Sequence, residues 1–134
     1  MRISLDSNVL VSAVATRGLS YDVLRLVLAR HELVLGEAVL AEVERVLREK
    51  LGVAPEIVSE FEQMLRREAV VIVAQAPSLD IALRDPNDVV VLEQAVAGKA
   101  ALLVTGDRDL LDAADVAPLR ILTPRKLWEM LRTS

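Results

Sequence analysis

The stretch Ala101-Leu-Leu-Val-Thr-Gly-Asp-Arg-Asp-Leu110 decides the predicted fold of this chain. It begins with a near-continuous apolar run, and a run of this kind bounded by glycine is typical of a central strand that is covered on both faces of a parallel sheet. Thr105 and Gly106 then lead directly into the acidic pair Asp107 and Asp109. The stretch therefore predicts a buried strand that ends by presenting carboxylates at one edge of a sheet.

Strand-like and helix-like segments alternate on either side of this stretch. The predicted strands are 1–6, 32–35, 70–73, 101–105 and 120–122, and the predicted helices run over about 7–15, 21–30, 37–50, 55–68, 86–97 and 124–131. The segment 74–83 is predicted to be a loop. Such alternation predicts an α/β fold, a three-layer sandwich with a central parallel sheet and helices on both faces. In sheets of this kind ligands bind beyond the carboxyl ends of the strands, where the strand order reverses.

Length and composition fit a small domain with an aliphatic core. At 134 residues we expect a single domain over 1–134, and because 53% of residues are hydrophobic but only 2% aromatic, the core must be built from Val, Leu, Ile and Ala. Apolar stretches such as 9–15 are far shorter than the ~20 residues of a membrane span, and no leader-like segment precedes a cleavage site. We therefore expect a soluble, cytoplasmic protein.

The scarcity of cysteine and histidine narrows the available chemistry. The chain has no Cys and one His, so thiol nucleophiles, zinc sites and Ser-His-Asp triads are hard to assemble. His31 is expected to end a helix at the surface. A formal charge of −4 argues weakly against nucleic-acid binding by bulk charge, but a rim of cations can still contact phosphates. Candidates for such a rim are Arg17, Arg108 and Arg125.

Acidic residues far apart in the chain fall where predicted strands or helices begin or end. Asp6 follows the first strand, Asp88 begins the helix 86–97, and Asp107 and Asp109 follow the strand 101–105. Glu42 lies within the helix 37–50, where its apolar neighbours predict a position nearer the buried boundary than that of Glu44.

Each of these acids also has an ordinary structural explanation. Asp6, Asp85 and Asp88 can cap helices or interact with the helix dipole, Glu42 can belong to a solvated helix face, and a tight turn can explain Gly106. The joint pattern favours a site, because carboxylates gathered without matched cations repel one another by roughly 4 kcal/mol per close pair at the dielectric near a protein surface. A hard divalent cation, Mg²⁺ or Mn²⁺, would relieve that repulsion, and such ions commonly support phosphate chemistry.

Four motifs resemble those of the PIN-domain ribonucleases, and specifically the VapC-like toxin components of bacterial or archaeal toxin-antitoxin pairs. They are Leu5-Asp-Ser-Asn-Val-Leu-Val-Ser-Ala13, Glu37-Ala-Val-Leu-Ala-Glu-Val43, Asp85-Pro-Asn-Asp88 with Ala95, and Val104-Thr-Gly-Asp-Arg-Asp-Leu-Leu111. The ending Ile121-Leu-Thr-Pro124 before an amphipathic helix is similar as well. The chain departs from the pattern at Ser7, where Thr is usual, at Gly36, where Ser is frequent, and at Asn87 and Val89, where Asp and Asn are common. No acidic position is lost, so the resemblance implies a PIN-like fold with an intact site.

The resemblance also implies an activity and a set of roles. The family consists of metal-dependent endoribonucleases that cut single-stranded or looped RNA and leave 5′-phosphate and 3′-hydroxyl ends. By this resemblance Asp6, Glu42, Asp88 and Asp107 would be catalytic and would hold one or two Mg²⁺ or Mn²⁺ ions, with Asp109 as a further ligand. Ser7, Asn8 and Thr105 would orient carboxylates or waters, or would simply cap helices.

The sequence is compatible with several partners and with more than one function. Family members commonly form homodimers and are inhibited by a cognate antitoxin protein, so both are possible partners beside the RNA substrate. One alternative is a PIN-like RNA-binding or scaffolding module, and another is an RNA-processing nuclease without an antitoxin. An aspartyl-phosphate domain also places acids at strand ends, but it would need a lysine nearby, and Lys50, Lys99 and Lys126 are poorly placed for that role.

Overall fold

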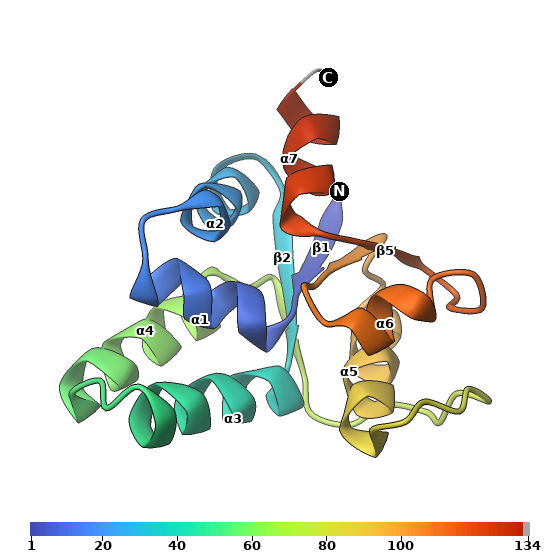
Figure 1. The fold of residues 1–134 in the computed structure, drawn as a ribbon, viewed down its shortest axis with the longest axis horizontal. Helices are drawn as coiled ribbons and strands as arrows, with labels where there is room; N and C mark the ends of the chain where they lie inside the picture. The colour runs from blue at the N-terminus through green and yellow to red at the C-terminus, as the bar shows by residue number, and fades with distance from the viewer. Residues whose placement is uncertain (133–134) are drawn as a thin grey trace.

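Five parallel strands form the centre of the molecule in the computed structural model, which describes residues 1–132 (Figure 1). Their order is β3-β2-β1-β4-β5, and every neighbouring pair is parallel. The strands are β1 (Arg2–Leu5), β2 (Glu32–Gly36), β3 (Val71–Val73), β4 (Leu102–Val104) and β5 (Arg120–Leu122). The α/β fold with a central parallel sheet is therefore confirmed, and all five predicted strands are present.

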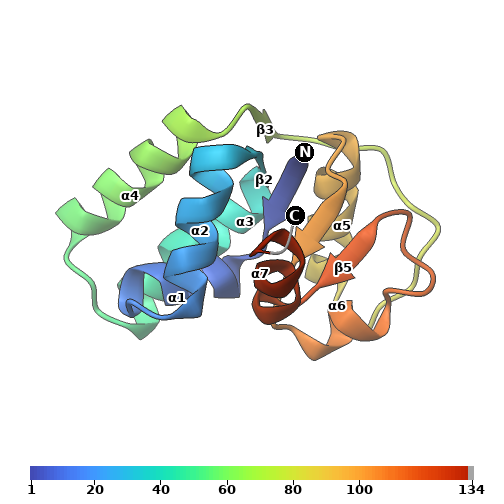
Figure 2. The same ribbon diagram turned by 90° about the horizontal axis from the view of Figure 1, so that it is seen from above.

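Helices connect the strands and cover the sheet. They are α1 (Ser7–Ala15), α2 (Leu19–Arg30), α3 (Glu37–Arg45), a π-helical turn η1 (Val46–Lys50), α4 (Pro55–Glu68), α5 (Pro86–Ala97), α6 (Arg108–Asp112) and α7 (Pro124–Arg132). Figures 1 and 2 show α1 and α2 on the opposite side of the sheet from α5. None of the helices in residues 1–132 combines the length and the apolar character needed to cross a membrane.

Alternation along the strands divides the core between the two faces of the sheet. The larger core includes side chains from α1, α2, α3, α4 and α7. The strand residues that face it include Ile3, Leu5 and Leu33. Val34, Leu103 and neighbouring positions face the opposite way, toward α5 and α6. Successive side chains of a strand point to opposite faces, so strands that are apolar at every position need cover on both sides.

The helices differ from the prediction at the start of α2, which lies at Leu19 rather than at 21, and in two further places. The short helix α6 was not predicted, because five residues contain too little periodicity to be recognised. The predicted helix 37–50 is confirmed, but after Arg45 it continues as the π-helical turn η1. It is followed by Gly52, which has a φ of 63° as expected for a helix stop.

Gly106 lies in a local turn, as predicted, since the Asp107 N–H donates to the Thr105 hydroxyl at 3.0 Å, but that turn does not use the conformational freedom of glycine. The Gly106 backbone is not in the left-handed region, since the glycine with positive φ among residues 1–132 is Gly52. An added Cβ at Gly106 would meet only the Asn8 side chain, at an ordinary 3.6 Å. The Gly106 N–H instead donates a hydrogen bond of 3.0 Å to Asn8 Oδ1.

The strand order reverses between β1 and β4, which run side by side at the centre of the sheet. From β1 the chain first adds β2 and β3 on one side of β1, and it then adds β4 and β5 on the other side. At the carboxyl ends of these two strands the Asp6 N–H donates to the Val104 carbonyl at 2.9 Å. Asp6 and Thr105 therefore leave the sheet beside each other, at the place where such folds bind ligands.

Candidate active site

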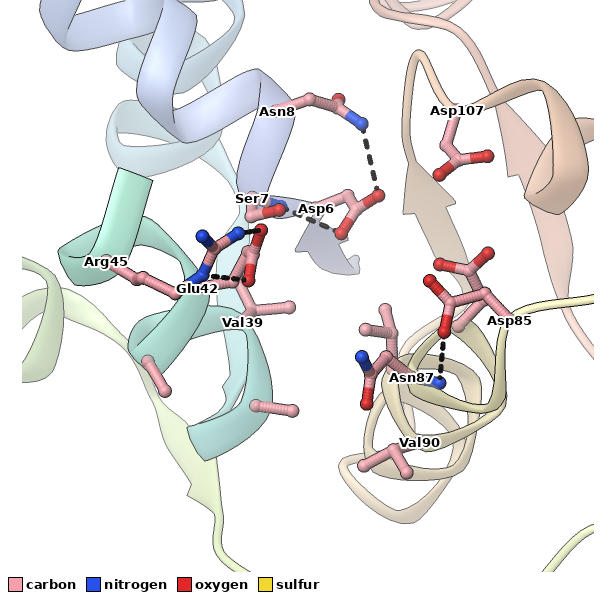
Figure 3. Close-up of a pocket in the computed structure, with 14 residues that line it drawn as sticks. Asp6, Ser7, Asn8, Val39, Glu42, Arg45, Asp85, Asn87, Val90 and Asp107 are labelled. Carbon is pink, nitrogen blue, oxygen red and sulfur yellow. Dashed lines mark hydrogen bonds and ion pairs between the residues drawn. The ribbon is translucent and has the colours of Figure 1, made fainter. Parts of the chain in front are cut away.

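A cavity of about 590 Å³ lies beyond the carboxyl ends of β1 and β4, between α3 on one side and α5 on the other (Figure 3). Figure 3 shows Glu42 and Arg45 on one wall, Asp85, Asn87 and Val90 on the other, and Asp6 between them. The lining residues are Asp6, Ser7, Asn8, Ala38, Val39, Ala41, Glu42, Arg45, Asp85, Asn87, Asp88, Val90, Val91 and Asp107. The four positions predicted to be catalytic all line this one cavity.

Asp6 is a buried carboxylate fixed by hydrogen bonds. It is 5% exposed, and its Oδ1 accepts from the Ser7 N–H at 2.8 Å, so Asp6 caps α1. Its Oδ2 accepts from the Thr105 hydroxyl at 2.7 Å and from the Asn8 amide at 3.3 Å. The capping explanation for Asp6 is thus correct, and it coexists with a place in the cavity.

Thr105 connects Asp6, at the end of β1, with Asp107, which follows β4. Its hydroxyl donates to Asp6 and accepts from the Asp107 N–H at 3.0 Å and the Asn8 amide at 3.3 Å. The donor and both acceptor positions of this hydroxyl are therefore used. Of the three residues predicted to have supporting roles, Asn8 and Thr105 contact Asp6 through their side chains, whereas Ser7 contributes its backbone N–H.

The carboxylates of Asp88, Asp107 and Asp109 lie close together at the N-terminal ends of α5 and α6. Asp107 caps α6, where its Oδ1 accepts from the Asp109 N–H at 2.8 Å, and Asp85 caps α5 by accepting from the Asn87 N–H at 2.9 Å. Asp88 and Asp109 occupy the first turns of these helices. One carboxylate oxygen from each of Asp88, Asp107 and Asp109 lies within 4.8 Å of the others.

Burial and mutual repulsion raise the pKa of two carboxyl groups in this site. The pKa of Asp88 is raised to about 6 by burial first, then by the charges of Asp107, Asp85, Asp6 and Asp109. The pKa of Asp6 is also raised, mainly by burial, although its hydrogen bonds from Thr105 and Ser7 act in the opposite direction. These acids therefore interact electrostatically although they come from three separate regions of the chain.

Glu42 lines the same cavity, but it has a counter-ion. Arg45 donates two hydrogen bonds to it, from Nη2 to Oε1 at 2.7 Å and from Nε to Oε2 at 3.2 Å. The expectation that Glu42 is nearer the buried boundary than Glu44 is wrong, because both side chains are 43% exposed. What separates them is direction, since Glu42 lines the cavity whereas Glu44 pairs with Arg48 at 2.9 Å.

Gly36 and Gln94 hold the start of α3, which carries Glu42. A Cβ at residue 36 would collide with Gln94 Oε1, so the buried Gln94 side chain occupies the space that a larger residue would need. Gln94 Oε1 in turn accepts from the Ala38 N–H at 3.0 Å, which satisfies a free donor of the first helical turn. A glutamine from α5 thereby caps α3, a task that a serine at position 36 could perform by itself.

The three arginines predicted to contact phosphates do not line the cavity. Arg17 lies over the Tyr21 ring, 5.5 Å from its centroid, and Arg108 and Arg125 are exposed outside the cavity lining. His31 ends α2, as expected, with its Nδ1 3.3 Å from the N-terminal amine. Arg45 and Gln94 were not predicted from the sequence. The spacing of Glu42 and Arg45, three residues apart on a helix, was the available signal for the first.

Comparison with known proteins identifies the family and the fold of this chain. The model of the PIN domain family matches residues 2–109, and this chain belongs to that family. Among solved structures it is similar to a chain in the crystal structure of VapBC2 from Rickettsia felis bound to a DNA fragment from their promoter. The two share 20% identity and a TM-score of 0.64 over 92% of this chain and 98% of that one, which shows a common fold. Comparison with curated proteins gives no significant match.

The donor set suits a hard divalent cation. The groups that converge are carboxylate oxygens, without thiolate or imidazole, and such oxygens are the ligands that Mg²⁺ and Mn²⁺ prefer. The raised pKa values of Asp6 and Asp88 are caused first by burial and then by neighbouring carboxylates, and they are a further sign of fit because a bound cation would stabilise both ionised forms.

Proposed function

We propose that this protein is a metal-dependent endoribonuclease that hydrolyses RNA phosphodiester bonds, using Mg²⁺ or Mn²⁺. The observation that carries the proposal is the convergence of Asp88, Asp107 and Asp109, with carboxylate oxygens within 4.8 Å of one another, at the switch point of a PIN-domain sheet. The cavity at that place is lined by five carboxylates, whose oxygens are suited to binding a cation.

Each acid of the site has a role in this proposal. Asp88, Asp107 and Asp109 would hold one ion, Asp6 would share it or orient a water bound to it, and Glu42 would complete the site from the opposite wall. When bound, such an ion supplies an activated water nucleophile and stabilises the charge that develops on the phosphate. The described side chains of the cavity include no thiol or imidazole, so the nucleophile in this proposal is water.

The supporting hydrogen bonds keep the acids in place. Thr105 and Asn8 hold Asp6, while Thr105 also fixes the backbone of Asp107. A carboxylate whose rotamer is locked in this way requires little reorganisation when an ion binds. The capping N–H groups of Ser7 and Asp109 hold the carboxylates of Asp6 and Asp107 as well.

The biological setting we propose is a cytoplasmic toxin-antitoxin pair. The similar structure from Rickettsia felis is that of VapBC2 bound to a DNA fragment from their promoter, and the shared fold extends over nearly all of both chains. We propose a VapC-like toxin that acts on RNA as a homodimer and is inhibited by a cognate antitoxin. Inspection of the neighbouring reading frame for a small DNA-binding protein tests the toxin assignment separately from the chemistry.

The direct test is cleavage of a mixed RNA population. We expect cleavage with Mg²⁺ or Mn²⁺ that is lost with EDTA and lost in Asp107→Ala, with 5′-phosphate ends on the products. Asp112→Ala, at the exposed end of the same helix, is the matched control and should retain activity. RNA that is bound but left intact under all metal conditions would instead support a binding or scaffolding module.

A further inference from the structure

The charges that line the cavity are strongly unbalanced. Its lining contains five carboxylates, those of Asp6, Glu42, Asp85, Asp88 and Asp107, and among the described lining residues one cationic side chain, that of Arg45. An RNA phosphate that enters this cavity meets repulsion on every side except where a metal ion or Arg45 faces it. Arg45 is therefore the side chain best placed to contact the substrate backbone directly.

The position of Arg45 is suited to that contact. Figure 3 shows it with Glu42 on the α3 wall, across the cavity from the residues of α5 and from Asp107. An ion held by the acids at α5 and α6 would therefore approach a phosphate from one side, and Arg45 from the other. The guanidinium presents paired donors that match two phosphate oxygens, as it already matches the two oxygens of Glu42.

The pairing of Arg45 with Glu42 is exchangeable. Both side chains are nearly half exposed, at 44% and 43%, and ion pairs of that exposure contribute little to stability. A second carboxylate, Glu49 on the π-helical turn η1, lies 3.9 Å from Arg45 Nη1. Arg45 can thus leave Glu42 without losing all of its negative neighbours.

We propose that Arg45 is the phosphate-binding residue of this site, and that it exchanges Glu42 for the RNA backbone when a divalent cation binds the cavity. Without metal, Arg45 neutralises Glu42 and competes with a cation for that carboxylate. With metal and RNA, the cation takes over Glu42 and the guanidinium contacts a phosphate. This inference rests on the proposed nuclease function and assigns to it a substrate contact.

The test uses Arg45→Gln beside the matched control Arg48→Gln. Arg48 is on the same helical segment and makes a similar pair with Glu44 at 2.9 Å, but it does not line the acidic cavity. Mn²⁺ binding is measured by calorimetry without RNA. Arg45→Gln should bind Mn²⁺ a few-fold more tightly than the wild type, and Arg48→Gln should match the wild type.

RNA binding gives the second readout. A short labelled single-stranded RNA is titrated in Ca²⁺ at several salt concentrations, and gels verify that it stays intact. Arg45→Gln should weaken binding roughly 5- to 10-fold and lower the slope of log K against log salt by about 0.7, the value for one lost phosphate contact on a single strand. Arg45→Lys should keep that slope, because it retains the charge while losing the paired donors.

The outcomes separate this inference from the function on which it rests. Unchanged RNA affinity and salt slope in Arg45→Gln, or weakened Mn²⁺ binding, would overturn the role of Arg45 even if the wild type cleaves RNA. An Arg45-dependent affinity for RNA in a wild type that never cleaves it would keep the phosphate contact and reject the nuclease. A wild type that binds neither Mn²⁺ nor RNA would reject both.

Discussion

Replacing Asp88 with Asn is the sharpest test of whether the acids of the cavity form a metal site. The Asp88 side chain makes no hydrogen bond or ion pair with the rest of residues 1–132, so the substitution removes charge without breaking a contact. Asp6 is less suitable, because it accepts three hydrogen bonds, and an amide cannot accept all of them in the same geometry. In the metal-free protein Asp88→Asn should therefore be stabilising.

The expected size follows from the raised pKa of Asp88. A shift from 3.8 to about 6 corresponds to roughly 3 kcal/mol of unfavourable interaction in the ionised form, at about 1.4 kcal/mol per pH unit. Partial exposure reduces this to about 1–2 kcal/mol, and loss of the favourable interaction with the α5 dipole removes a further 0.3–1 kcal/mol or so. A net gain of about 1 kcal/mol raises the melting temperature by roughly 3–5 °C for a domain of this size.

The dependence on pH has a definite sign. The folded protein binds the Asp88 proton more tightly than the unfolded chain does, so the destabilisation is complete above about pH 6 and disappears below about pH 4. The difference in melting temperature between Asp88→Asn and the wild type should therefore be present at pH 7.5 and vanish near pH 4. Asp22→Asn is the matched control, since Asp22 is an exposed acid in the first turn of α2, away from the cavity.

Thermal melts in EDTA and in Mg²⁺ complete the experiment. Asp22→Asn should be neutral or slightly destabilising through loss of the dipole interaction. Mg²⁺ should stabilise the wild type by RT ln(1 + [Mg²⁺]/Kd), and it should stabilise Asp88→Asn much less. If Asp88→Asn melts at or below the temperature of Asp22→Asn in EDTA at pH 7.5, burial and repulsion of the Asp88 charge do not destabilise the protein and the prediction is refuted.

Three other predictions address the rest of the site. Thr105→Val should destabilise the protein by about 1–3 kcal/mol in urea titrations, because the Asp6 carboxylate loses a donor at 2.7 Å; an unchanged midpoint would count against this bridge. Gly36→Ala should destabilise by about 2 kcal/mol or more through collision with Gln94, and adding Gln94→Ala should recover part of that loss, so additive effects in the double-mutant cycle would contradict the packing. Mn²⁺ affinity measured by calorimetry should fall as pH decreases through about 6, with proton release on binding, because Asp6 and Asp88 hold their protons more tightly than usual; affinity independent of pH would exclude both as ligands.

Much of the architecture was predictable because the strands carry their own signal. Residues 102–104 are all buried, and a short, continuous apolar run of that kind is typical of a central strand covered on both faces. The acids were predictable for a similar local reason, since a strand that ends in Asp or a helix that begins with it can be recognised without knowing its neighbours. The helix α6 was not predictable, because five residues show too little periodicity and the burial of Leu110 depends on the rest of the fold.

The sequence by itself determined the alternation of strands and helices, the aliphatic core and the supply of carboxylates, because each depends on residues close together in the chain. Only the tertiary structure decided which carboxylates share an environment. It brought Asp88, Asp107 and Asp109 together, joined Asp6 to them through Thr105, and gave Glu42 a counter-ion. The physical reason is that charge interactions depend on distance and burial, and both are set by strand order and by the direction of each helix rather than by position along the chain.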